Sequence, residues 1–256
     1  MSDLFNLQGK TAVIIGGNST LARVMAEGLA EHGAKIALVV LELSMGDEVE
    51  EQICAIGGEV KTFVGDVTNR ASLEAAVKDI ADWAGSIDVL LNAAGINSAT
   101  PFFELSMDEW DKIMAVNLRG TVQVCQIFGE KMIELGNGGS IINFSSVSSG
   151  PPLSKVFTYS ASKAAVNSVT QFLARDLAPH KIRVNAVVPG FFPAEQNRKI
   201  LTKERVEDIM RHTPVNRFGE PEELKGVAIW LASEKASSYV TGSLVRVDGG
   251  FGAMTI

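Results

Sequence analysis

The stretch 146-SVSSGPPLSKVFTYSASK-163 organises this sequence. It follows Ser140–Phe144, an apolar run typical of a buried strand. It leads into a segment whose apolar residues recur at helical spacing as far as Leu177. A strand, a loop and an amphipathic helix in succession form the repeating unit of a parallel α/β sheet.

Tyr159 and Lys163 are four residues apart, so a helix places them on one face, one turn apart. A lysine there favours the phenolate and lowers the phenol pKa from about 10 towards neutral pH. This predicts a general acid or base, and Ser146, at the end of the preceding strand, is placed to hydrogen-bond the same reacting oxygen. Ordinary amphipathic helices show the same Tyr–Lys spacing, so the spacing alone leaves both interpretations open.

The composition is that of a globular protein with an acidic surface. The chain has 256 residues, 46% of them hydrophobic and 21% charged, with a formal net charge of −7. Such a length suits one α/β domain, and we expect a single domain over residues 1–256. Nucleic acids and anionic membranes attract basic patches, so the charge argues against both as partners.

Cys54 and Cys125 are the only cysteines, and neither has a His or another Cys nearby in sequence. We expect two buried free thiols and no metal site. The first ten residues, MSDLFNLQGK, lack the pattern of a secretory signal, and no apolar run approaches the length of a membrane span. The expected location is the cytoplasm.

Strand-like and helix-like segments alternate along the whole chain. Strands are predicted at 11–15, 35–41, 60–65, 88–91, 140–144, 183–188 and 244–247. Helices are predicted at 21–32, 48–56, 72–83, 108–135 (as one long helix), from residue 159, and at 221–232, with a less regular insert ending near 217. This order predicts a Rossmann-type, doubly wound parallel sheet of about seven strands with helices on both faces.

Gly16, Asn18, Ser19, Thr20 and Leu21 lie in the turn between the first strand and the first helix. In sheets of this type cofactors bind at the carboxyl ends of the strands, with phosphates at the N-terminus of a helix. The turn is therefore a candidate phosphate site, although an ordinary strand–helix turn has a similar composition.

From about Gly9 to Gly250 the chain resembles the short-chain dehydrogenase/reductase family. In that family a strand-end Ser precedes Tyr by thirteen positions and Tyr precedes Lys by four, as Ser146, Tyr159 and Lys163 do here. The resemblance implies a catalytic tetrad of these three residues with Asn117, whose family counterpart holds a water that links the lysine to solvent. It also implies exchange between a secondary alcohol and a ketone with NAD(P). The alternative is a catalytically idle relative that binds only a nucleotide or a partner.

The resemblance also implies a set of cofactor-binding residues. Beside Tyr159, Lys163 and the glycine-containing turn, these are Asp66, Val67, Asn92, Ala93, Ala94, Gly95, Pro189, Gly190 and Phe192. Three positions depart from the family pattern: Thr20 and Ala22 replace glycines, and Ala194 replaces a threonine that bonds the nicotinamide carboxamide.

The end of the second strand selects between the two nicotinamide cofactors. An acid there suits the 2′-hydroxyl of NAD, whereas a basic residue suits the 2′-phosphate of NADP. Val40 and Leu41 occupy the usual positions, and Glu42 is the nearest acid. Because no cation is present, we expect NAD in preference to NADP.

Two loops, near 147–158 and 191–217, are expected to bind a small-molecule substrate. They resemble the D-mannonate oxidoreductase (fructuronate reductase) branch of the family, which implies a sugar acid. Lys155 and Arg198 are the candidate cations for its carboxylate, Gln196 and Asn197 are candidates for its hydroxyls, and Ser146 and Tyr159 contact the reacting oxygen. Gluconate with 5-ketogluconate, or another polyol or keto-acid pair, is the closest alternative. The family further implies a homotetramer.

Overall fold

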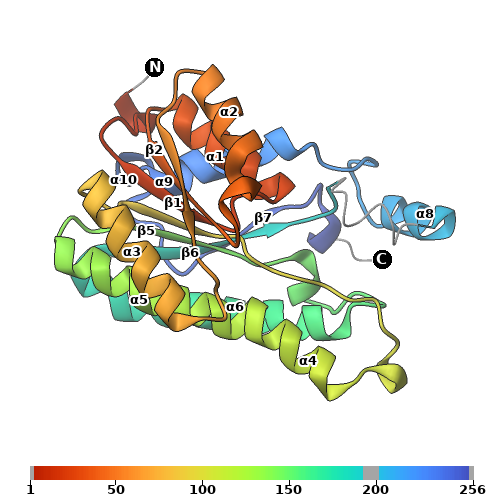
Figure 1. Cartoon of the computed structure of the whole chain (residues 1–256). Coiled ribbons are helices and arrows are strands. Elements are labelled where there is room, and N and C mark those ends of the chain that lie inside the picture. The colour runs from red at the N-terminus through yellow and green to blue at the C-terminus, as the bar shows by residue number, and fades with distance from the viewer. Residues whose placement is uncertain (1–2, 193–201, 254–256) are drawn as a thin grey trace.

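A seven-stranded sheet forms the centre of the computed structural model, which describes residues 3–192 and 202–253 (Figure 1). The strands are β1 (Thr11–Ile15), β2 (Lys35–Val40), β3 (Val60–Val64), β4 (Val89–Asn92), β5 (Gly139–Phe144), β6 (Ile182–Pro189) and β7 (Leu244–Val247). Their order is β3-β2-β1-β4-β5-β6-β7, and all six neighbouring pairs are parallel. The predicted Rossmann-type fold is confirmed.

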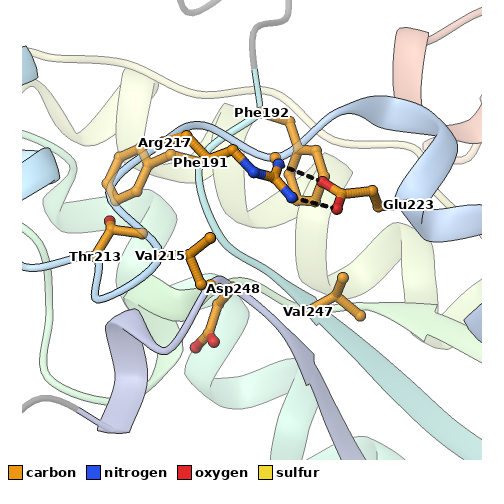
Figure 2. A pocket seen from close by; sticks show the side chains of 10 residues that line it. Phe191, Phe192, Thr213, Val215, Arg217, Glu223, Val247 and Asp248 are labelled. Atoms are coloured by element: carbon orange, nitrogen blue, oxygen red, sulfur yellow. Dashed lines mark hydrogen bonds and ion pairs between the residues drawn. The ribbon is translucent and has the colours of Figure 1, made fainter.

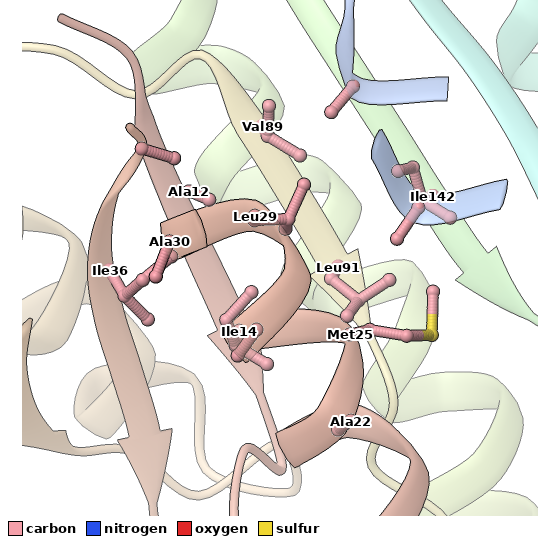
Figure 3. Packing of buried hydrophobic residues seen from close by; sticks show 14 of the residues in the cluster. Ala12, Ile14, Ala22, Met25, Leu29, Ala30, Ile36, Val89, Leu91 and Ile142 are labelled. Carbon is pink, nitrogen blue, oxygen red and sulfur yellow. The ribbon is translucent and has the colours of Figure 1, made fainter. Parts of the chain in front are cut away.

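Helices cover both faces of the sheet because successive strand residues point to opposite sides. Ala12 and Ile14 of β1 belong to one buried cluster, and Val13 and Ile15 belong to the other. The helices α1 (Thr20–Glu31), α2 (Asp47–Ala55) and α9 (Lys225–Ala232) pack on the first face. The helices α3 (Arg70–Ala84), α5 (Thr121–Leu135) and α6 (Phe157–Leu177) pack on the second. Figure 3 shows α1 lying over the first cluster.

The predicted long helix is helical throughout but is not one regular α-helix. It consists of α4 (Met107–Met114), a π-helical turn at Ala115–Gly120 and α5. The Thr121 hydroxyl donates to the Asn117 carbonyl oxygen at 2.8 Å. A Cβ on Gly120 would lie 2.8 Å from Val67 Cγ2, so the turn packs closely against the segment that follows β3. Such π-turns inside α-helices often occur at functional sites.

The insert before residue 217 contains a helix that the sequence did not predict. Helix α8 (Lys203–Arg211) begins after Thr202, whose hydroxyl accepts the N–H of Arg205. It projects away from the sheet (Figure 1). Ile209 is its one buried residue, as expected for a helix whose sequence is strongly polar. The predicted helix at 221–232 divides into a 3-10 turn (Pro221–Leu224) and α9, and a further short helix, α10 (Glu234–Ser237), follows.

The two cysteines differ in environment. Cys125 is buried in the second cluster, whereas Cys54 near the end of α2 is exposed, so the expectation of two buried thiols is wrong for Cys54. Its position on α2 faces away from the sheet, while Val49 and Ile53 face the core. Within the described ranges, no helix is long and apolar enough to cross a membrane.

Candidate active site

The carboxyl ends of β1 and β4 form the switch point of the sheet, where the chain turns to β2 on one side and to β5 on the other. Ligands of such sheets bind in the crevice outside this point. Gly16, which follows β1, has a φ of +72°, and a Cβ on it would lie 2.9 Å from Ala94 Cα and N. The turn after β1 and the segment Ala93–Gly95 after β4 therefore meet, and only glycine fits at residue 16.

The start of α1 fits a pyrophosphate. Ser19 occupies the N-cap position without making a side-chain capping bond, and the first turn of α1 contains no acid. The N–H groups of that turn can therefore bind an anion. Thr20 opens the helix and is half-buried, as is Leu21, whereas Asn18 is exposed. The replacement of glycine by Thr20 leaves these donors in place.

The segment after β3 is held by its own side chains. One Asp66 carboxylate oxygen, Oδ1, accepts from the N–H and the hydroxyl of Thr68, at 2.8 and 2.7 Å. Val67 is buried in the second cluster, and its carbonyl accepts from Gln123 Nε2 at 2.8 Å. Both residues stand where the sequence analysis placed them, at the carboxyl edge of the sheet.

The family resemblance implies that the segment at 92–95 lines the ribose and supports the central sheet, and the Asn92 side chain has the second of these roles. Its side chain is buried, and Nδ2 donates to Asn143 Oδ1 at 3.0 Å and to Cys125 Sγ at 3.3 Å. Asn143 Nδ2 donates in turn to the Thr170 hydroxyl at 2.9 Å. Asn92 is the last residue of β4 and points into the core, so its side chain supports the sheet and does not line the crevice.

At the end of β2 the three selector positions differ in exposure. Val40 is 2% exposed and faces the core, whereas Leu41 is 58% exposed. Glu42 is exposed and precedes a 3-10 turn at Leu43–Gly46. Of these residues, only Leu41 and Glu42 can contact a ribose from this edge.

Ser146 and Tyr159 are brought together by the loop between β5 and α6. Tyr159 lies in the first turn of α6, and the Ser146 hydroxyl lies close enough to its phenol to affect the pKa of that group. Burial raises the pKa of the Tyr159 phenol above its ordinary value, while the Ser146 hydroxyl acts in the opposite direction. The predicted lowering of this pKa by Lys163 is therefore wrong for this structure.

The position of Lys163 explains the difference. Its side chain is buried, and Nζ donates to the Phe144 carbonyl oxygen at 2.8 Å. Nζ lies 5.6 Å from the centre of the Tyr159 ring. Burial lowers the pKa of Lys163 to about 8, so the site disfavours charge on both groups.

Asn117, in the π-helical turn, is fully buried beside these residues. Its Nδ2 donates to the Ile96 carbonyl oxygen at 2.9 Å and to Ser162 Oγ at 3.0 Å, and its Oδ1 accepts the Ile96 N–H at 2.8 Å. A Cβ on Gly95 would lie 3.4 Å from Asn117 Oδ1 and 3.6 Å from Lys163 Nζ. Asn117 thus joins the segment after β4 to α6 around the lysine.

Pro189 ends β6, and Gly190 packs against β7, where a Cβ would lie 2.7 Å from Asp248 Cα. The Phe192 side chain is buried in the first cluster, so it anchors this turn. Beside it lies a cavity of about 150 Å³, and the ion pair of Arg217 with Glu223 forms part of its lining (Figure 2). The cavity is lined by Phe191, Phe192, Thr213, Val215, Arg217, Gly219, Glu223, Val247, Asp248 and Gly249, and by none of the four predicted catalytic residues.

Comparisons with known proteins agree with this geometry. A family model described as enoyl-(acyl carrier protein) reductase matches residues 16–252. The chain is 38% identical over 267 residues to the uncharacterized oxidoreductase UxuB of Bacillus subtilis, covering 96% of each sequence. The chain belongs to the short-chain dehydrogenase/reductase family.

Two solved structures of this family are closely similar. A gluconate 5-dehydrogenase from Burkholderia cenocepacia, in complex with NADP and tartrate, is 34% identical with a TM-score of 0.94 and 99% of each chain covered. A candidate D-mannonate oxidoreductase from Haemophilus influenza with bound NAD is 33% identical with a TM-score of 0.92, covering 98% of this chain and 97% of that one. As a member of the short-chain dehydrogenase/reductase family, the present chain is an NAD(P)-dependent dehydrogenase/reductase that acts on CH–OH groups of a small-molecule substrate.

Among the predicted substrate residues, Lys155 is exposed in the loop before α6, with a φ of +69°. The pKa of the Glu204 carboxyl at the start of α8 is lowered mainly by hydrogen bonds with its own backbone N–H and with Thr202, and the charge of Lys155 adds a smaller effect. Gln196, Asn197 and Arg198, like Ala194, lie outside the described residues. The sequence analysis missed Arg205, whose guanidinium donates to Ser154 Oγ at 3.1 Å and to its carbonyl at 3.0 Å. Contacts between α8 and this loop leave no signal in sequence spacing.

Asn167 is a second residue of the site that was not predicted from the sequence. It lies one turn beyond Lys163 on α6, and it hydrogen-bonds Ser145 and Ser149 on either side of Ser146. The signal was present, because the spacing of four that joins Tyr159 to Lys163 continues to residue 167.

Proposed function

We propose that this enzyme interconverts a secondary alcohol and a ketone of a sugar acid or polyol. The observation that carries the proposal is the cluster of Ser146, Tyr159 and Lys163 beside the switch point. Bound NAD(P) would supply the hydride acceptor or donor. Tyr159 exchanges the proton with the substrate oxygen, and Ser146 hydrogen-bonds that oxygen. Lys163 and Asn117 connect the phenol to a proton relay.

The environment of Tyr159 favours its protonated form, so at neutral pH it is ready to act as the general acid in ketone reduction. Alcohol oxidation requires the phenolate and should increase as the pH rises. The positively charged ring of an oxidised nicotinamide would favour the phenolate by electrostatic attraction.

We assign NAD as the preferred cofactor. Leu41 and Glu42 supply no cation for a 2′-phosphate, and the exposed Glu42 carboxylate would accept a hydrogen bond from a 2′-hydroxyl. Titration with NADH and NADPH, followed by nicotinamide fluorescence, tests this assignment. We expect tighter binding of NADH, and a Glu42→Arg variant should bind NADPH more tightly than the unchanged protein does. Tenfold tighter binding of NADPH by the unchanged protein would contradict the assignment.

The substrate is assigned as a sugar acid such as D-mannonate with D-fructuronate. The likeness to a candidate D-mannonate oxidoreductase supports this assignment, while the likeness to a gluconate 5-dehydrogenase favours gluconate with 5-ketogluconate as the second candidate. Lys155 and Arg198 are proposed to bind the carboxylate, and Gln196 and Asn197 the hydroxyls, within the loops 147–158 and 191–217.

The test is NADH oxidation with fructuronate, tagaturonate, 5-ketogluconate and an acetoacetyl thioester. Lys155→Ala and Arg198→Ala should raise KM for the sugar acids and leave KM for NADH unchanged. Lys181→Ala is a matched control, because Lys181 is also exposed and has a positive φ. It lies directly before β6, at the amino ends of the strands and away from the substrate loops. Activity on the thioester alone would exclude the sugar-acid assignment.

We further propose a homotetramer that uses the long helices α5 and α6 and strand β7. Strand β7 is an edge of the sheet among the described residues, and its N–H and C=O groups on that side can pair with another chain. Sedimentation that shows only a 27.3 kDa species would exclude it.

A further inference from the structure

One face of helix α6 is hydrogen-bonded to the turn that carries Ser146. Lys163 Nζ donates to the Phe144 carbonyl oxygen, just before the turn. One helical turn further on, Asn167 contacts both sides of Ser146: its Oδ1 accepts from Ser145 Oγ at 2.5 Å, and its Nδ2 donates to Ser149 Oγ at 2.9 Å. The side chain of Asn167 is thus a bridge across the turn.

Ser149 passes this contact to the backbone of Ser146. Its hydroxyl donates to the Ser146 carbonyl oxygen at 2.6 Å, and its N–H donates to the same oxygen at 2.9 Å. The direction of these hydrogen bonds is set by Asn167, because its amide nitrogen can only donate. The Ser149 oxygen therefore accepts from Asn167, and its proton is directed to Ser146.

The Ser146 hydroxyl is oriented in the same way. Its oxygen accepts from the N–H of Ser148 at 3.2 Å and from the hydroxyl of Ser148 at 3.1 Å. A hydroxyl has two lone pairs and one proton. With both lone pairs engaged, the remaining proton of Ser146 is available to the Tyr159 oxygen or to the substrate oxygen. Ser148 is 1% exposed, so its own hydroxyl is shielded from water.

We propose that Asn167 is a positioning residue for the reaction: through Ser149 it fixes the turn that holds Ser146, while Ser148 fixes the direction of the Ser146 proton. This inference rests on the proposed roles of Ser146 and Tyr159. It differs from a purely structural role because the contacts of Asn167 end on the backbone of Ser146, the residue whose hydroxyl lies near Tyr159.

The test compares Asn167→Ala and Ser149→Ala with Ser149→Thr, which keeps the hydroxyl, and with Ser168→Ala. Ser168 follows Asn167 but is exposed, so it is a matched control on the same helix. We expect kcat to fall about tenfold in the two alanine variants at positions 167 and 149, since misplacement of a reacting group is costly. KM for both substrates should change less than threefold. Ser149→Thr should recover most of kcat, and Ser168→Ala should match the unchanged enzyme.

A second readout is the pH profile of ketone reduction. The Ser146 hydroxyl lowers the pKa of Tyr159, so misplacement of this hydroxyl in Asn167→Ala should move the alkaline limb of kcat to higher pH. Active sites are counted by NADH titration, so that loss of folded protein is not mistaken for lower turnover. An unchanged kcat and pH profile in Asn167→Ala would overturn the inference. Full activity in Tyr159→Phe would instead overturn the proposed function.

Discussion

The Lys163 ammonium group donates to the Phe144 carbonyl oxygen at 2.8 Å and so joins α6 to the end of β5. Nζ lies 5.6 Å from the centre of the Tyr159 ring. A buried cation with one neutral acceptor is poorly compensated, which is why the pKa of Lys163 falls to about 8.

This pKa predicts how stability changes with pH. Between about pH 8 and pH 10.5 the unfolded chain keeps a proton on Lys163 that the folded protein has lost. The free energy of unfolding contributed by Lys163 should therefore rise with pH across that window, by about 3 kcal/mol in total. Urea unfolding of the unchanged protein and of Lys163→Met, at one protein concentration, measures the difference. The raised pKa of Cys125, about 12, has the opposite effect but is common to both proteins. Parallel pH dependences would contradict the prediction.

Tyr159→Phe should lower turnover by about 10²- to 10⁴-fold, the usual contribution of a general acid or base. In the unchanged enzyme, ketone reduction should decline as the pH rises through the raised pKa of Tyr159, because the phenol then loses the proton that it donates. The variant should lack this decline and should keep the circular dichroism spectrum and the NADH affinity of the parent. Retained turnover would remove Tyr159 from the chemistry.

Gly16 and Gly85 form a matched pair for testing the cofactor turn. Their φ values are +72° and +74°, so alanine is strained by a similar amount, of order 1–2 kcal/mol, at each position. A Cβ at residue 16 would also lie 2.9 Å from Ala94, whereas residue 85 has open space around it. Both variants should lose stability, but only Gly16→Ala should lose NADH affinity, by tenfold or more. Equal NADH affinity in the two variants would show that the turn after β1 does not hold the cofactor.

The two cysteines should react differently with a thiol reagent. Cys54 is exposed, whereas burial raises the pKa of Cys125 to about 12 and leaves almost no thiolate. Ellman's reagent should therefore titrate one thiol per chain in the native protein and two in denaturant. Cys54→Ser should leave no rapidly reacting thiol. Two fast thiols in the native protein would mean that the core around Cys125 opens.

The strand segments and the layering were predictable because the parallel strands are continuous apolar runs separated by amphipathic segments. Asn92 shows where such prediction fails. The predicted strand stopped at Leu91, but β4 continues for one more residue, and that residue points into the core. Because helices cover both faces of this sheet, a residue that still belongs to the strand points into the core, whereas a residue after the strand can face the crevice.

The electrostatics of the site could not be predicted from spacing. The separation of Tyr159 and Lys163 indicates that they share a face, as they do, but burial determines both pKa values, and burial depends on the packed structure. The contact of Arg205 with Ser154 has the same limit, because it joins residues 51 positions apart through α8. Asn167, by contrast, was within reach of the spacing argument that identified Lys163.

The hydrogen-bonded amides of Asn92 and Asn143, both buried, help to fix the register of β4 against β5. They are cross-strand partners in the parallel register, and among the described residues their side chains are hydrogen-bonded to each other, to Cys125 and to Thr170. An apolar pair would tolerate a slipped alignment, whereas a slip of one residue here would leave buried amides without partners at a cost of about 1–3 kcal/mol each. During folding, misaligned pairings of β4 with β5 are therefore penalised, and β4 is one of the two strands that flank the crevice.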